Sequence, residues 1–130
     1  ADAPYQSVCT TGTHDMNPLR ARWEEDREVT QRFYNEQMGW WGDAPKEMTP
    51  EIAEFIINQH MYSPAMWTIL PLQDWLAIDG DVRIKDQFAD RINVPSNPRQ
   101  FWNYRMHLKI EELMKCDALN KKIKKLTSVR

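Results

Sequence analysis

Cysteine and glycine are scarce in this chain of 130 residues, which has two cysteines and four glycines. Cys9 and Cys116 are too few and too far apart to form a disulfide framework, so we expect free thiols in a reducing compartment. Neither cysteine has a second cysteine or a histidine at ligand spacing, and the histidines at 14, 60 and 107 are scattered. The sequence therefore predicts no metal site.

The chain also lacks a dominant charge and a long apolar run. Seventeen Lys and Arg oppose nineteen Asp and Glu, a net charge of −2 that excludes a strongly basic nucleic-acid-binding protein. No stretch approaches the roughly 18 consecutive apolar residues of a membrane span, and the first residues do not have the basic and apolar regions of a signal peptide. We therefore expect neither nucleic acid nor membrane as a partner.

Two uncharged segments have the pattern of short strands. Tyr5–Thr11 is rich in β-branched and aromatic residues, and Ala65–Leu72 has the little-alternating apolar pattern of a strand buried on both faces. Between them, Leu19–Met38 and a segment that begins at Thr49-Pro50 have helical patterns, each preceded by a cap residue and a proline. Two strands joined by a helical crossover form a βαβ unit and require a parallel sheet. Because two strands leave open edges, we expect self-association through these edges or further strands in a longer protein.

The rest of the chain divides into a loop and a helical region. Asp79–Asn97 is rich in turn residues, whereas Arg99–Leu126 is predicted to be helical in two or three pieces. The run Lys121-Lys122-Ile-Lys124-Lys125 has the charge to contact phosphates or an acidic membrane. A solvated face near a helix C-terminus, where positive charge is favourable, is the simpler interpretation.

Polar residues follow both predicted strands. Gly12-Thr13-His14-Asp15 comes after the first strand, and Gln73-Asp74 after the second. In parallel (β/α) folds these strand ends lie side by side and face the active site, where a carboxylate beside an imidazole can bind hydroxyl-rich ligands or stabilise positive charge. The alternative is structural: each Asp would cap the helix that follows it, and His14 would bond to backbone groups.

Six tryptophans are many for this length. Some of them could stack on sugar rings, but tryptophan more commonly packs in a core. We assign Trp23 and Trp67 to the core, and the Trp40-Trp41 loop between two glycines is the candidate for a sugar-binding surface.

Three stretches carry a family resemblance: TTGTHDMNPLRARW from Thr10, SPAMWTILPLQDWLAI from Ser63 and RINVPSNPRQFWNYRMHLKIEEL from Arg91. In this order and approximate spacing they resemble the C-terminal end of the 4-α-glucanotransferases, the amylomaltases or disproportionating enzymes of glycoside hydrolase family 77. The third stretch is most similar to the larger variants of plants and some bacteria. Together the three stretches cover nearly the whole chain.

The resemblance implies an α/β fold, the C-terminal fragment of a (β/α)8 TIM barrel. Residues 1–130 would be the C-terminal portion of the catalytic barrel, with Tyr5–Thr11 as strand seven, Met66–Pro71 as strand eight and a terminal basic helix over residues 110–130. A full barrel needs about 250 residues, so the chain would be about half of one. In isolation we expect it to be mostly helical.

The resemblance also implies an activity, the transfer of α-1,4-glucan segments between maltodextrins by a retaining double displacement in the cytoplasm, without a cofactor. Asp15 would be the third active-site carboxylate, which stabilises the transition state. His14 would hydrogen-bond the same sugar ring. The other expected substrate-binding residues are Gln73, Asp74, Arg91, Asn93, Trp40 and Trp41.

The resemblance further implies that the nucleophile and the general acid/base lie upstream of Ala1, so we expect the isolated chain to be inactive. The alternative is a small non-catalytic helical carbohydrate-binding or scaffold module that uses the Trp40-Trp41 loop.

Overall fold

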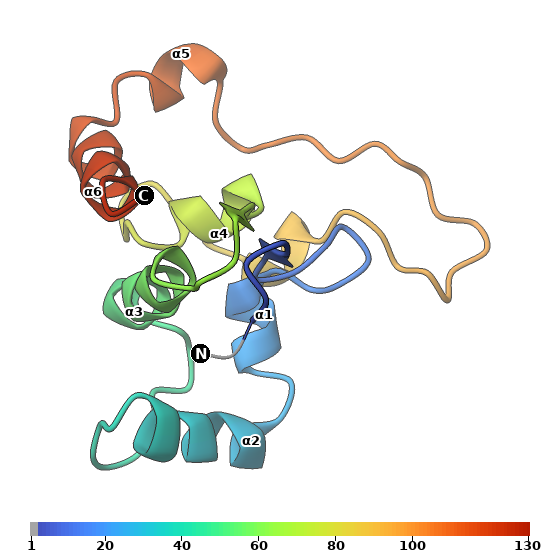
Figure 1. The fold of residues 1–130 in the computed structure, drawn as a ribbon. Coiled ribbons are helices and arrows are strands. Elements are labelled where there is room, and N and C mark those ends of the chain that lie inside the picture. The colour runs from blue at the N-terminus through green and yellow to red at the C-terminus, as the bar shows by residue number, and fades with distance from the viewer. Residues whose placement is uncertain (1–2) are drawn as a thin grey trace.

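The computed structural model describes residues 3–130, a predominantly helical chain with one small sheet (Figure 1). The α-helices are α1 (Leu19–Trp23), α2 (Arg27–Arg32), α3 (Pro50–Met61), α4 (Leu72–Leu76), α5 (Ile110–Leu113) and α6 (Asp117–Thr127). A π-helical turn, η1 (Phe33–Gln37), follows α2, and a 3₁₀ turn, η2 (Gln87–Asp90), follows α4. The strands are β1 (Val8–Cys9) and β2 (Trp67–Thr68). No helix within residues 3–130 has the length and apolar character to cross a membrane.

The two strands pair in parallel, with Val8 opposite Trp67 and Cys9 opposite Thr68. Backbone bonds extend the pairing beyond the strands, since Met66 N donates to Tyr5 O at 2.7 Å and Ile69 N to Cys9 O at 2.9 Å. The helices α1 to α3 form the crossover between the strands, which confirms the predicted parallel pairing. Both strands are shorter than predicted because, within the described residues, each has only one partner.

The predicted helix over Leu19–Met38 is broken into three pieces. The Asp26 side chain accepts from Glu28 N at 3.0 Å and Val29 N at 3.1 Å, so it caps a new helix where the pattern alone predicts a continuous one. The start of α3 is as predicted: Pro50 occupies the first turn, and the Thr49 hydroxyl accepts from Ile52 N at 3.3 Å.

The helical prediction for Arg99–Leu126 is wrong in its first part. Residues 99–109 continue an extended arm that runs from the loop after η2 to α5 (Figure 1). Tyr104 Oη donates to Asp90 Oδ1 at 2.9 Å, and His107 Nε2 lies 2.7 Å from Val82 O. These long-range bonds anchor the arm in an extended form, and helical pairing resumes only at α5 and α6.

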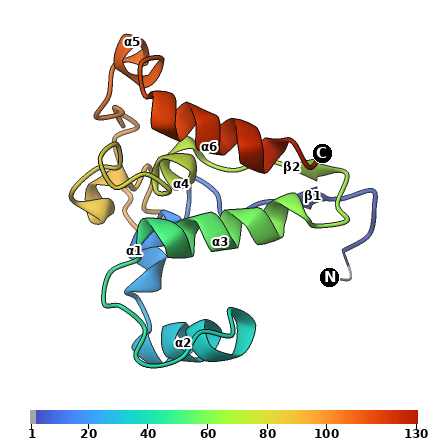
Figure 2. The same ribbon diagram turned by 90° about the vertical axis from the view of Figure 1, so that its left-hand side faces the viewer.

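The core lies between α1, α3, α4 and α6 (Figure 2). Its fully buried side chains include Ile52 and Ile57 of α3, Leu76 of α4 and Leu119 of α6. Trp23 is in this core, as predicted.

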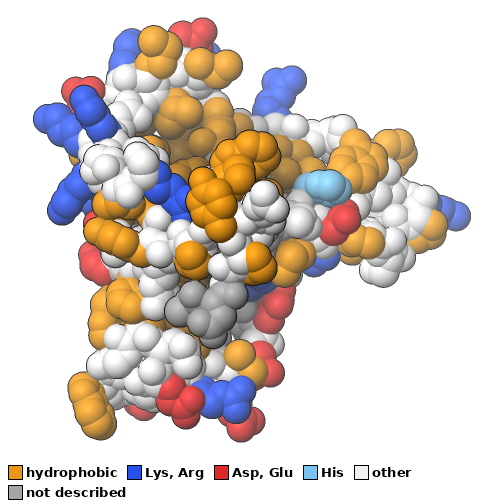
Figure 3. Space-filling model, viewed as in Figure 1, with side chains coloured by type: hydrophobic (Ala, Val, Ile, Leu, Met, Phe, Trp, Pro, Cys, Tyr) orange, Lys and Arg blue, Asp and Glu red, His pale blue; other side chains and the backbone are white. Residues whose placement is uncertain are grey.

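The core assignment of Trp67 is wrong, because 60% of this residue is exposed. Tyr5, Val8 and Ile69 are exposed with it, and Figure 3 shows hydrophobic side chains gathered on this face of the molecule. Within the described residues no layer covers that face of the sheet, so the predicted burial on both faces is not found.

Candidate functional site

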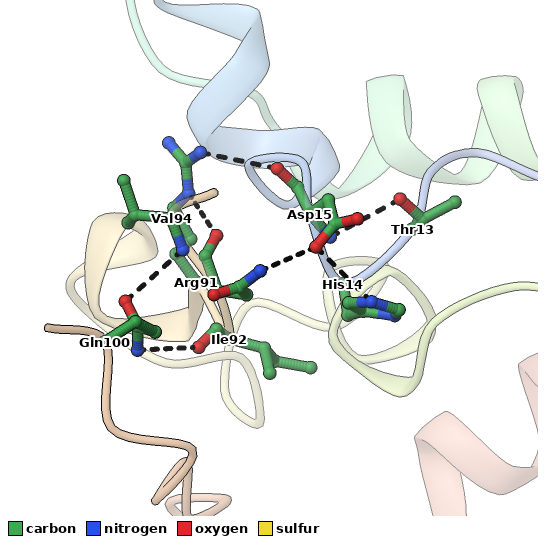
Figure 4. Close-up of polar contacts among 8 residues, drawn as sticks. Thr13, His14, Asp15, Arg91, Ile92, Val94 and Gln100 are labelled. Carbon is green, nitrogen blue, oxygen red and sulfur yellow. Dashed lines mark hydrogen bonds and ion pairs between the residues drawn. The ribbon is translucent and has the colours of Figure 1, made fainter. Parts of the chain in front are cut away.

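The candidate site lies at the carboxyl end of β1, where the loop after the strand meets the segment after η2 (Figure 4). Asn93 N donates to His14 O at 3.1 Å, which joins two segments that are far apart in the sequence. The structure thus brings together Asp15, His14, Arg91 and Asn93, four of the predicted site residues.

The Asp15 carboxylate is held at one oxygen. Asn93 Nδ2 donates to Asp15 Oδ1 at 2.6 Å, and His14 Nε2 lies 3.3 Å from the same oxygen. The Asp15 side chain is 49% exposed, whereas Asn93 is buried. Within the described residues Oδ2 has no side-chain partner, so the carboxylate is positioned through one oxygen and open to a ligand through the other.

Arg91 holds the backbone around this carboxylate in place through hydrogen bonds. Its Nε donates to Asn93 O at 2.9 Å, Nη1 to Asn17 Oδ1 at 3.1 Å and Nη2 to Asp15 O at 3.4 Å. A planar guanidinium can make these bonds together because its donors are arranged in a fixed fork. The three bonds tie both segments of the site to one side chain.

Asp74 is buried beneath the site, with 1% of the residue exposed. Its Oδ2 accepts from Thr11 Oγ1 at 2.5 Å and its Oδ1 from Leu19 N at 2.9 Å. Burial raises the pKa of this carboxyl, and the two hydrogen bonds oppose the rise. The capping interpretation therefore applies to Asp74, although the helix it caps is α1 and not the one that contains it. The Asp15 side chain is engaged by Asn93 and His14, and within the described residues no bond joins it to an amide of α1, so it does not cap that helix.

A second buried carboxyl, Asp90, lies nearby and was not predicted from the sequence. It accepts a bond from Tyr104 Oη, and its backbone oxygen accepts from Gln73 Nε2 at 3.5 Å. Burial raises the pKa of Asp90, while the Tyr104 bond acts to lower it. A cavity of about 30 Å³, enough for one water molecule, is lined by His14, Gln73, Asp74 and Asp90 among others.

The tryptophans divide between two places. Trp102, on the extended arm, stacks edge-on against His14 with ring centroids 5.4 Å apart. Trp40 packs edge-on against Tyr34 and Phe55, whereas Trp41 is 94% exposed. Their loop, between η1 and α3, lies at the lower end of Figure 1, away from the loop after β1, so the structure does not bring Trp40 and Trp41 to Asp15.

Tyr104 and Trp102 reach the site through the path of the arm, whereas Asp90 is the last residue of η2. Their signal in the sequence was weak: Asp90 directly precedes the stretch from Arg91, and the other two lie within that stretch. Among residues 3–130 no group of three or more His, Cys, Asp or Glu side chains is placed to hold a metal ion.

A half-exposed carboxylate beside an imidazole, an amide and an indole at the end of a parallel strand has the chemistry to hydrogen-bond the hydroxyl groups of a ligand. The chain belongs to glycoside hydrolase family 77, because residues 1–110 match the 4-alpha-glucanotransferase family. The family resemblance found in the sequence is thereby confirmed.

Two known proteins illustrate this relationship. The chain is 38% identical over 124 residues to the 4-alpha-glucanotransferase DPE2 of Oryza sativa subsp. japonica, an alignment that covers 95% of this chain and 13% of the rice protein. Its fold matches that of the amylomaltase from Streptococcus agalactiae, solved in complex with acarbose, with a TM-score of 0.70 and 20% sequence identity. That match covers 98% of this chain and 22% of the bacterial one. The chain thus spans a small part of both relatives.

Proposed function

We propose that this chain is the C-terminal part of the catalytic (β/α)8 barrel of a 4-α-glucanotransferase, with β1 as strand seven and β2 as strand eight. Three observations support the proposal: the family membership, the parallel pairing of β1 and β2 across a helical crossover, and the small share of each relative that the chain spans. The substrates would be α-1,4-glucans, and no cofactor would be needed.

The proposed active site rests on one observation: the Asp15 carboxylate is held at Oδ1 by Asn93 and His14 and is open at Oδ2. Asp15 would bind hydroxyls of the distorted sugar ring and stabilise the oxocarbenium-like transition state. His14 would hydrogen-bond the same ring. Arg91 and Asn93 would shape the loop around this ring, Gln73 would line the site beneath it, and Asp74 would support the site by fixing the start of α1.

The reaction would be a retaining double displacement. A carboxylate nucleophile attacks the anomeric carbon, and a Glu acid protonates the leaving glycosidic oxygen. The same Glu then removes a proton from the hydroxyl of an acceptor sugar, whose oxygen attacks the anomeric carbon and releases the nucleophile. Both of those residues belong to segments outside this chain, so the isolated chain is proposed to be inactive.

A graft tests this proposal. In the rice relative, the aligned segment is replaced by this chain, and the disproportionation of maltotriose is followed. We expect an active graft whose kcat falls about a thousandfold in Asp15→Asn, because the variant removes charge at the developing cation. The matched control is Asp81→Asn, which changes an exposed carboxylate that takes no part in the hydrogen bonds of the site and should retain activity.

Two results would count against the proposal: a graft in which Asp15→Asn is as active as the parent, or an isolated chain that disproportionates maltotriose at a rate comparable to that of the graft. The first would remove Asp15 from the reaction, and the second would show that the chain carries its own nucleophile.

We also propose a cytoplasmic location, which the free thiols of Cys9 and Cys116 support. Alkylation of free thiols tests it: both thiols should be alkylated, without prior reduction, by a reagent added when the cells are lysed.

A further inference from the structure

Trp41 is the most exposed aromatic residue among residues 3–130, with 94% of its surface accessible. A tryptophan that packs in a core or an interface buries about 150–250 Å². The adjacent Trp40 does pack, since its ring lies edge-on against Tyr34 and Phe55 at centroid distances of 5.6 and 5.7 Å. The two neighbouring indoles therefore have opposite surroundings, and packing within the described residues gives no reason for an indole at position 41.

The loop that carries Trp41 is held in shape by hydrogen bonds on both sides of this residue. Asn35 Nδ2 donates to Trp40 O at 2.7 Å, and Gln31 Nε2 donates to Gly42 O at 2.9 Å. Gly42 has a φ of 89°, a conformation that favours glycine, and makes the turn directly after the indole. The indole is thus presented to solvent by a bonded backbone, which lowers the ordering cost of binding a ligand.

A surface hollow of about 540 Å³ lies beside this indole. Its lining includes Trp41 together with two acidic residues, Glu36 of η1 and Asp43 of the loop. Both acidic residues are exposed, and within residues 3–130 neither carboxylate has a hydrogen-bond or ion-pair partner. A carboxylate only accepts hydrogen bonds, and bonds to a charged acceptor are the stronger ones. An apolar ring beside two free acceptors complements a sugar, which has an apolar ring face and hydroxyl donors at its edge.

The hollow is separate from the candidate site around Asp15. The loop between η1 and α3 lies at the lower end of Figure 1, away from the loop after β1. The cavity beneath the candidate site, lined by His14 and Asp74 among others, shares no lining residue with the hollow beside Trp41. A sugar ring on Trp41 would therefore leave the Asp15 carboxylate free.

We propose that the Trp41 indole, flanked by the Glu36 and Asp43 carboxylates, is a surface binding site for α-1,4-glucan chains. One sugar ring would stack its apolar face on the indole, and its hydroxyls would donate to the two carboxylates. The choice of an α-1,4-glucan rests on the proposed function, because the substrate of that reaction has many sugar rings and can be held at a second point. Attachment at this second point would raise the effective concentration of glucan at Asp15.

Titration of the chain with maltoheptaose tests the site. Isothermal titration calorimetry gives the Kd, which we expect to be about 1 mM because one ring and two acceptors make few contacts. Trp41→Ala should raise the Kd at least about tenfold. Because the side chain is exposed, this variant should fold normally, and circular dichroism checks that it retains its helices.

Two controls separate this site from other exposed rings and from the candidate active site. Phe101→Ala removes another exposed aromatic ring, on the extended arm, and should leave the Kd within about twofold of the parent value. Asp15→Asn changes the carboxylate of the candidate active site and should also leave the Kd for maltoheptaose within about twofold.

A double variant tests the carboxylates while the indole stays in place. Glu36→Ala combined with Asp43→Ala removes two exposed side chains, so the chain should fold normally. Because the sugar hydroxyls lose their charged acceptors, we expect the Kd to rise at least about threefold. An unchanged Kd for this double variant would overturn the site as proposed.

The outcomes distinguish this inference from the proposed function. A titration without saturation up to about 20 mM maltoheptaose would overturn the inference, as would a Kd that Trp41→Ala leaves unchanged. An active graft would still support the proposed function in either case. An inactive graft, combined with maltoheptaose binding that Trp41→Ala weakens, would overturn the glucanotransferase activity and leave the surface site intact.

Discussion

Replacing Asp74 should destabilise the chain more than replacing any other carboxylate of the candidate site. The side chain is buried and receives two hydrogen bonds, from the Thr11 hydroxyl and the Leu19 amide. Asp74→Ala leaves both donors without a partner. Hydrogen bonds to a charged group contribute about 1.5–3 kcal/mol each, and removal of the buried charge recovers part of its desolvation cost. We expect the free energy of unfolding to fall by about 2–4 kcal/mol.

Asp74→Asn separates the hydrogen bonds from the charge. The amide keeps an oxygen for one donor and presents an NH2 group to the other, so the loss should be about 1 kcal/mol. Urea unfolding followed by tryptophan fluorescence measures both variants, with Asp81→Asn as an exposed control that should change stability by less than about 0.5 kcal/mol. A loss below about 0.5 kcal/mol for Asp74→Ala would refute the reasoning.

The pH dependence gives an independent test of the same carboxyl. Burial raises the pKa of Asp74 in the folded chain above its usual 3.8, so the folded state binds the proton more tightly than the unfolded state does. The stability due to this group is therefore present at low pH and is lost as the pH rises from 3.8 through the folded pKa. Burial also raises the pKa of Asp90, so the stability due to Asp90 is likewise lost as the pH rises. In Asp74→Asn, the part of the pH dependence of the free energy of unfolding that is due to Asp74 should disappear, and the part due to Asp90 should remain.

Three further predictions concern the site, the tryptophans and the sheet. In the graft, Asn93→Ala removes the amide donor that positions the half-exposed Asp15 carboxylate. We expect kcat/KM for maltotriose to fall by about tenfold to a hundredfold, while the urea midpoint stays unchanged. Unchanged kinetics would contradict this role of Asn93. In the isolated chain, Trp40→Ala should lower the free energy of unfolding by about 3 kcal/mol, because the indole packs against two aromatic rings. Trp41→Ala should lower it by less than about 0.5 kcal/mol, because Trp41 is exposed. Equal urea midpoints for the two variants would contradict this difference. Saturable binding of maltoheptaose at Trp41 in a chain whose graft is inactive would favour the carbohydrate-binding module. Open strand edges should let the chain self-associate at high concentration, and a monomeric mass by light scattering at every concentration would contradict this.

The features that could be predicted from the sequence are those with a local signal or a family motif. Thr49-Pro50 marks the start of α3 by a cap followed by proline, which needs no information from elsewhere in the chain. The parallel pairing follows from two apolar segments with helices between them. Of the site, the grouping of Asp15 with Arg91 and Asn93 was implied by the family resemblance and not by their spacing.

The features that escaped prediction depend on distant partners. The apolar pattern of Arg99–Leu126 favours a helix, but bonds to Asp90 and Val82 hold the first part of this region extended. Trp67 is of a residue type that commonly packs in a core, but within residues 3–130 no further layer covers its face of the sheet, so the side chain is exposed. Sequence patterns describe a residue's neighbours along the chain, so they do not specify which remote group it meets.

The cap that Asp74 provides for α1 has a consequence for how the protein is made. The first helix is only five residues long, too short to be stable alone, and the group that bonds its first amide lies 55 residues further along the chain. During synthesis on the ribosome, residues 19–23 leave the exit tunnel well before residue 74 does. The candidate-site loop in front of α1 therefore acquires its final form late, after β2 and α4 have been translated and have docked.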